Sequence, residues 1–259
     1  MSLVEFVSGP ARYAPNTPWH ATWAAAATLL ILLASQAIVT LVFPLLTGLA
    51  AHDLPMRPVE AAGTDSAVSI LMLWLLLTQA ATVSLVLGAA NLFGGRPREV
   101  LRLTGHGVGM RTLAYAVVLM AVVLGSFNAL VYWLRPSDML DDLQLYAGFI
   151  RSDAWLLAGL AIGIGAPLME ELLFRGFLQS ALAQSQLGFW AAAILTTAAW
   201  TVLHWGYSAV GLLEVFLIGL YFSWLLWKTG SLLPALFCHA LYNSGLMLVL
   251  RFAELPVNQ

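Results

Sequence analysis

Residues 154–183 read AWLLAGLAIGIGAPLMEELLFRGFLQSALA, an apolar run that contains three charged side chains, Glu170, Glu171 and Arg175. About 20 apolar residues are enough to span a lipid bilayer as a helix, so this run has the length of a membrane span. One charged side chain at the centre of a bilayer costs about 2.5–3.5 kcal/mol on insertion scales. Three charges so close together therefore indicate groups that pair with one another or take part in chemistry.

The spacing of these charged residues predicts which of them pair. Glu171 and Arg175 lie four residues apart, so they share one face of a helix and can form an ion pair. Glu170 is rotated from Glu171 by about 100° around the helix axis and points elsewhere. We expect the partner of Glu170 to come from a later segment of the chain.

The composition is that of an integral membrane protein. The chain has 259 residues, of which 61% are hydrophobic and 9% charged, and its mean hydropathy is +0.86. Soluble domains carry about 25% charged residues. The net charge of −2 gives no reason to expect a nucleic acid as a partner. The single cysteine, Cys238, excludes an internal disulfide.

The apolar runs predict an all-α, polytopic membrane bundle of about seven transmembrane helices. We expect one integral membrane domain over residues 1–259, with N-terminal spans in residues 1–150 and a catalytic core in residues 151–251. The expected spans cover residues 23–46, 67–93, 113–134, 154–183, 189–205, 209–227 and 232–251. Residues 140–150 are expected to form a short interfacial helix.

The charges in the loops predict the orientation. The loop after the second span carries Arg96, Arg98, Arg102 and Arg111, which places it in the cytoplasm by the positive-inside rule. The acidic loop over residues 138–153 then faces the other side. The Ala-, Leu- and Trp-rich composition is typical of a bacterial protein, so we expect a multi-pass protein of the bacterial cytoplasmic (inner) membrane.

Three polar side chains in later spans could meet Glu170. His204 ends the fifth apolar run, and His239 and Asn243 share a helix face in the seventh. At about 1.5 Å per residue, His204 and Asn243 are expected near the depth of Glu170. His239 is expected about two turns shallower. The Glu170 layer lies nearer the face opposite Lys228, and the side from which a substrate enters is left open.

Such a group of side chains has a specific chemistry. A carboxylate beside an imidazole can deprotonate a water molecule that attacks a carbonyl carbon. A second imidazole and an amide can donate hydrogen bonds to the resulting oxyanion. The same residues could instead be packing residues and a structural ion pair. His204, His239, Glu170 and Glu171 could also bind zinc, but the chain has no His-Glu-x-x-His pair, so we expect no metal and no other cofactor.

Three motifs stand in order in this part of the chain: Glu-Glu-x-x-x-Arg at residues 170–175, Trp-x-x-x-His at 200–204 and His-x-x-x-Asn at 239–243. Residues 150–250 thereby resemble the CPBP intramembrane proteases, also called the CAAX-protease and bacteriocin-processing or ABI family. That family includes the type II CAAX prenyl endopeptidases. Its second motif begins with Phe, whereas this chain has Trp200.

The resemblance implies a glutamate-dependent endopeptidase that hydrolyses membrane-tethered peptides or proteins within the bilayer. Glu170 and His204 would activate the water, and His239 and Asn243 would hold the oxyanion. The residues expected to be catalytic are therefore Glu170, Glu171, His204, His239 and Asn243, with Arg175 and Trp200 in support. The expected partners are the substrate, the lipid bilayer and a further membrane protein.

Two other classes of function compete with this hypothesis. The chain could be a non-catalytic CPBP-like membrane scaffold, immunity factor or assembly factor, although the complete set of motif residues favours an active enzyme. It could also be a transporter that uses buried carboxylates for ion coupling. The lack of a detectable inverted repeat in the sequence counts against a transporter.

Overall fold

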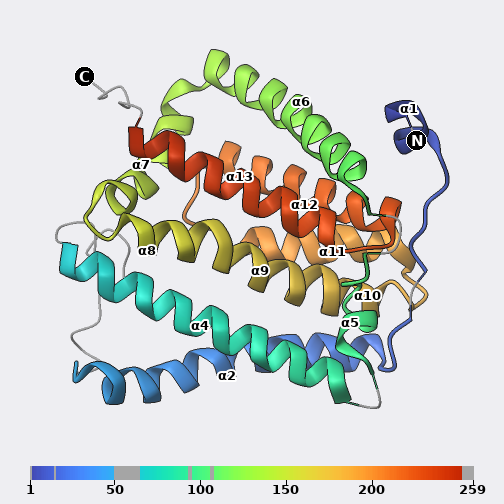
Figure 1. Ribbon diagram of the computed structural model, residues 1–259, viewed down its shortest axis with the longest axis horizontal. Coiled ribbons are helices and arrows are strands. Elements are labelled where there is room, and N and C mark those ends of the chain that lie inside the picture. Colours follow the sequence, from blue (N-terminus) through green and yellow to red (C-terminus); the bar gives the residue numbers. More distant parts are fainter. Residues whose placement is uncertain (1, 15, 50–64, 93–94, 106–107, 253–259) are drawn as a thin grey trace.

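The computed structural model describes residues 2–14, 16–49, 65–92, 95–105 and 108–252, and every regular element in these ranges is a helix (Figure 1). The long single helices are α2 (Ala21–Thr47), α4 (Asp65–Asn91), α6 (Met110–Leu134), α12 (Ala209–Thr229) and α13 (Leu233–Phe252). The shorter ones are α1 (Leu3–Ser8), α5 (Pro97–Val100), α7 (Pro136–Arg151) and α11 (Gly188–Val202). A further long helix runs from Trp155 to Leu182. It consists of α8 (Trp155–Leu160), η3 (Ala161–Gly165), α9 (Ala166–Glu170), η4 (Glu171–Gln179) and α10 (Ser180–Leu182).

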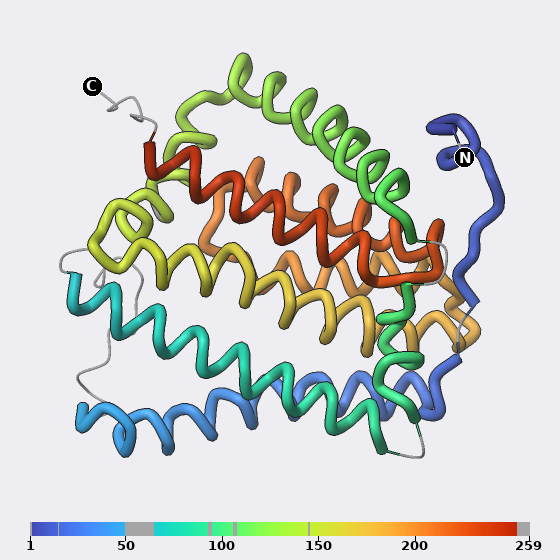
Figure 2. The backbone as a smooth tube through the Cα atoms, viewed as in Figure 1, coloured from blue at the N-terminus to red at the C-terminus, as the bar shows by residue number. Residues whose placement is uncertain are grey.

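The helices form a polytopic membrane bundle, as the sequence predicts. Six of them are long and apolar enough to cross a membrane: α2, α4, α6, the continuous helix α8–α10, α12 and α13. Helix α2 packs on α4, and α8–α10 lies in the middle of the bundle between α4 and α13 (Figures 1 and 2). The helix that carries Glu170, Glu171 and Arg175 is therefore central.

The fifth apolar run forms a shorter helix than the sequence predicts. Helix α11 ends at Val202 and has 15 residues, or about 22 Å at 1.5 Å per residue, against a hydrocarbon core of about 30 Å. The chain then turns through residues 203–208, where His204 N donates to Thr201 O at 2.9 Å and Tyr207 N to His204 O at 3.0 Å. His204 therefore sits in a turn between α11 and α12.

The central helix contains two π-helical stretches, η3 and η4. In η3, the carbonyl of Ala161 accepts from Gln79 at 3.0 Å, and that of Gly163 accepts from Ser244 at 3.3 Å. Gly163 makes this approach possible, because a Cβ atom there would lie 2.7 Å from Ser244 Oγ. Side chains of α4 and α13 thereby fix the central helix along its length.

The expected short helix over residues 140–150 is present as α7, which begins earlier at Pro136. It lies at the end of the bundle where α8 begins (left in Figure 1). Its Phe149 and Ile150 are buried in a cluster with α4 and α13. Its Asp142 accepts from the backbone N and from Oγ of Ser208, both at 2.7 Å, at the N-terminus of α12. Helix α7 is thus attached to both the core and the start of α12.

Candidate active site

The two glutamates lie at the junction of two helical stretches in the middle of the central helix. Glu170 is the last residue of α9 and Glu171 the first of η4, whose residues are all buried. Glu171 Oε1 lies 3.1 Å from Arg175 Nη1, and both side chains are 0% exposed. The ion pair predicted from their spacing is confirmed.

Aromatic rings surround the guanidinium of Arg175. Its Cζ lies 4.3 Å from the centroid of the Trp200 ring and 5.9 Å from that of Phe222. Gly219 leaves room for it, because a Cβ atom at that position would lie 2.7 Å from Arg175 Nη2. The buried cation is thus stabilised by a carboxylate and by ring faces, since aromatic faces attract cations.

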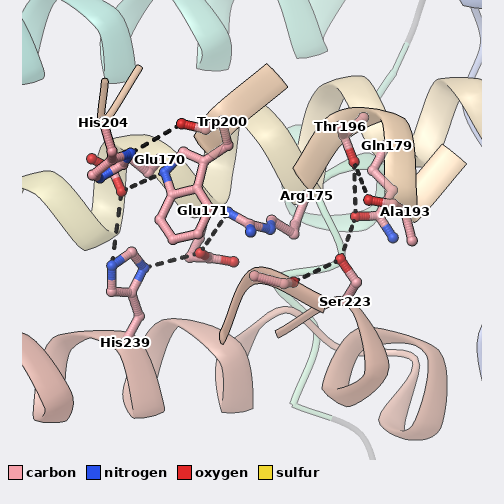
Figure 3. Close-up of polar contacts among 11 residues, drawn as sticks. Glu170, Glu171, Arg175, Gln179, Ala193, Thr196, Trp200, His204, Ser223 and His239 are labelled. Atoms are coloured by element: carbon pink, nitrogen blue, oxygen red, sulfur yellow. Dashed lines mark hydrogen bonds and ion pairs between the residues drawn. The ribbon is translucent and has the colours of Figure 1, made fainter. Parts of the chain in front are cut away.

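Glu170 meets side chains from two other helices (Figure 3). Trp200 Nε1 of α11 donates to Glu170 Oε2 at 2.8 Å. His239 Nε2 of α13 lies 3.8 Å from the same oxygen, and His239 Nδ1 lies 3.0 Å from Glu171 Oε1. The partner expected from later in the chain is therefore present. One imidazole bridges the two glutamates.

The expected depth of His239 is wrong. Counting residues from Gly230 along an upright helix placed it about two turns from the Glu170 layer, yet its ring contacts both glutamates. The His239 and Glu170 side chains are long enough to bridge much of this difference in depth. Tilting of the helices also changes the depth at which α13 crosses the central helix. The ring is held by a stack on Phe222, with centroids 4.8 Å apart.

His204 is connected to this group through Trp200. Its Nδ1 lies 3.0 Å from the carbonyl oxygen of Trp200, and the two rings meet edge to face at 4.9 Å. Because a carbonyl oxygen only accepts, Nδ1 carries a proton in this arrangement, and the tautomer that fits this contact keeps a lone pair on Nε2. Within the described part of the chain, His204 forms no hydrogen bond or ion pair with Glu170.

Asn243 occupies a neighbouring layer. Its Nδ2 donates to the carbonyl oxygen of Ile162 in η3 at 3.0 Å. Ile162 precedes Glu170 by eight residues, or about 12 Å along the helix axis. The structure thus brings five of the predicted side chains into one connected group: Glu170, Glu171, Arg175, Trp200 and His239. His204 joins this group through its contact with Trp200. Asn243 lies nearer the α7 end of the bundle.

A second polar group, which sequence reasoning missed, lies behind Arg175 (Figure 3). Gln179 Oε1 accepts from Ser223 Oγ at 2.9 Å and from Thr196 Oγ1 at 3.4 Å. All three side chains are buried. The spacing of Gln179, four residues after Arg175 on one helix face, was the available signal. The group ties η4 to α11 and α12 and so fixes the helices that carry the site.

Comparison with protein families gives one match. Residues 152–245 match the family model described as type II CAAX prenyl endopeptidase Rce1-like. This confirms the resemblance to the CPBP proteases. The matched segment contains all three motifs and also Trp200 and His239, which approach Glu170. Searches of curated proteins and of solved structures found no match. The chain is thus a multi-pass membrane protein whose residues 152–245 are similar to a protease family.

The Rce1-like segment has an unusual feature at Trp200, where the resemblance leads one to expect Phe. The indole ring packs on Arg175 as a phenyl ring would, but its N–H also holds Glu170. Trp200→Phe keeps the ring face and removes a hydrogen bond to a charged group, which is worth about 1.5–3 kcal/mol. If the site cleaves peptides, we expect roughly tenfold slower cleavage, together with a fall of about 1.5–3 kcal/mol in the free energy of unfolding.

The Trp200→Phe effect is measured as turnover of a quenched, membrane-anchored peptide in liposomes. The matched control is Trp190→Phe, since Trp190 lies on the same helix, is 43% exposed and packs on Phe189 and Trp227 instead. Equal activity of Trp200→Phe and Trp190→Phe would contradict a role for the indole N–H.

Proposed function

We propose that the protein is an intramembrane endopeptidase in which Glu170 activates the attacking water. One observation carries the proposal: Trp200 Nε1 donates to Oε2 of Glu170, and His239 Nε2 lies 3.8 Å from the same oxygen. The carboxylate is therefore held in a fixed orientation, with Oε1 turned to neither partner. A carboxylate fixed in this way in a bundle interior is suited to accept a proton from water.

The proposed reaction uses water as the only co-reactant. Glu170 Oε1 accepts a proton while the water oxygen adds to the carbonyl carbon of the scissile peptide. The lone pair of His204 Nε2 orients the water. The carbonyl oxygen becomes an oxyanion, the C–N bond then breaks, and the leaving amine takes the proton from Glu170. Glu171 and Arg175 hold His239 and Trp200 in place.

Oxyanion stabilisation by His239 and Asn243 stays a prediction. In this structure both nitrogens of His239 face carboxylate oxygens, and Asn243 donates one of its N–H groups to Ile162. The second N–H of the Asn243 amide remains to be used. A further donor near Glu170 would complete the site.

The substrate class follows from the position of the site. Glu170 lies in the middle of a membrane-spanning helix, so the scissile bond must reach it from within the bilayer. We propose membrane-tethered peptides or proteins as substrates and the bacterial cytoplasmic membrane as the location. The positive-inside rule then places the Arg-rich loop before α6 in the cytoplasm and α7 on the opposite side.

We propose that catalysis needs no metal, and we expect cleavage to survive chelation. His239 directs each of its nitrogens at a carboxylate oxygen, whereas a metal ligand needs a free imidazole lone pair. Among the described residues there is no group of three or more His, Cys, Asp or Glu suited to hold a metal.

The measurement uses the purified protein in liposomes with a quenched, lipid-anchored peptide. Cleavage is compared before and after EDTA or phenanthroline. Unchanged rates are expected. Loss of cleavage that returns on addition of zinc would overturn the metal-free mechanism and favour zinc bound by the same side chains.

A further inference from the structure

Two tyrosines extend the site toward α7. The hydroxyl of Tyr146, on α7, is in hydrogen-bond contact with the hydroxyl of Tyr207, in the turn before α12. The Tyr207 ring stacks on His204, with centroids 5.7 Å apart and planes 15° from parallel. A continuous set of contacts therefore runs from Glu170 through Trp200, His204 and Tyr207 to Tyr146.

Two hydroxyls in contact can donate one further hydrogen bond to a third group. Each tyrosine hydroxyl carries one hydrogen, and only one of the two hydrogens lies between the oxygens. When Tyr207 donates to Tyr146, the hydrogen of Tyr146 is free for a third acceptor. Tyr207 is held against His204 by the stacking of their rings.

The surroundings keep the Tyr146 hydroxyl protonated. Burial, followed by the charges of Glu170 and Asp142, raises the pKa of Tyr146 well above its usual range. The phenol therefore stays a hydrogen-bond donor at neutral pH. Asp142 accepts two hydrogen bonds from Ser208.

We propose that Tyr146 is a further catalytic residue, which donates a hydrogen bond to the oxyanion formed when water adds to the peptide carbonyl. Tyr207 is a positioning residue, which orients the Tyr146 hydroxyl by donating to it. The inference rests on the proposed peptidase function. It adds a donor at a site where both nitrogens of His239 face carboxylates and Asn243 gives one N–H to Ile162, and it gives α7 a role in the reaction.

The test compares Tyr146→Phe, Tyr207→Phe and the double variant with the wild-type protein. The probe is a lipid-anchored quenched peptide in liposomes. Loss of one oxyanion donor costs about 10²–10³-fold in kcat, so we expect a loss of that size for Tyr146→Phe, with KM and the thermal unfolding temperature unchanged. Tyr207→Phe is expected to lose less. The double variant is expected to resemble Tyr146→Phe, because residues that act as a unit are not additive.

A matched control is Tyr221→Phe, which removes a tyrosine hydroxyl that donates to the carbonyl of Ala116 between α12 and α6. Its kcat is expected to stay near that of the wild-type protein. Wild-type kcat in Tyr146→Phe, an effect confined to KM, or additive losses in the double variant would each overturn the inference. Failure of the wild-type protein to cut any peptide would instead overturn the proposed function, and this inference with it.

Discussion

Replacing Glu170 by Gln is expected to lower peptide cleavage by about 10²–10⁴-fold, the usual contribution of a general base. The amide keeps the size of the side chain, and its oxygen can still accept from Trp200. It cannot take a proton from water. The folded amount should therefore stay close to that of the wild-type protein, while turnover of a lipid-anchored quenched peptide is lost.

The matched control for this substitution is Glu214→Gln. Glu214 lies in α12, a later membrane span. Its Oε1 accepts from Asn128 at 2.7 Å and from Tyr242 at 2.8 Å. An amide oxygen can accept both bonds, so near-normal cleavage is expected. Residual cleavage by Glu170→Gln equal to that of Glu214→Gln would show that Glu170 is not the base.

Replacing Arg175 by Met is expected to reduce the free energy of unfolding by about 3–5 kcal/mol, because it leaves a buried carboxylate without its cation. Arg175 and Glu171 are both 0% exposed. The loss also removes the guanidinium from the face of Trp200. The measurement is the thermal unfolding temperature and the yield of monodisperse protein in detergent.

Two further variants make the Arg175 result specific. Arg96→Ala breaks the pair with Glu99, whose side chains are 81% and 56% exposed, and such a surface pair is worth at most about 1 kcal/mol. Glu171→Gln together with Arg175→Met removes the uncompensated charge and should be more stable than Arg175→Met alone. An Arg175→Met protein as stable as Arg96→Ala would contradict the account of this ion pair.

Several features of the site could be predicted from local sequence. The spacing of Glu171 and Arg175 predicts their ion pair, and helix periodicity is enough for that. The apolar runs predict the spanning helices, since their length is set by the bilayer. The charges in an apolar run pointed to a partner of Glu170 from later in the chain, and His239 of α13 lies beside it, although the depth count favoured His204 and Asn243.

Other features depend on how the helices cross, which residue counting does not give. The contact of His239 with both glutamates depends on the length of the side chains and on the course of α13. The end of α11 at Val202 depends on the turn over residues 203–208, which contacts α7. The N–H of Trp200 reaches Glu170 only because η4 and α11 lie side by side. Tyr146 lies in a segment with no motif, and no signal in the sequence connects it with Tyr207.

The central claim is that this chain cuts peptide bonds with Glu170. It is tested most directly by incubating purified wild-type, Glu170→Gln and Glu214→Gln proteins in liposomes with membrane proteins from cells that lack the chain. Mass spectrometry then identifies new peptide termini. We expect the same set of termini from the wild-type and Glu214→Gln proteins and none from Glu170→Gln. No new termini from the wild-type protein, or the same termini from Glu170→Gln, would contradict the claim and favour a non-catalytic membrane scaffold.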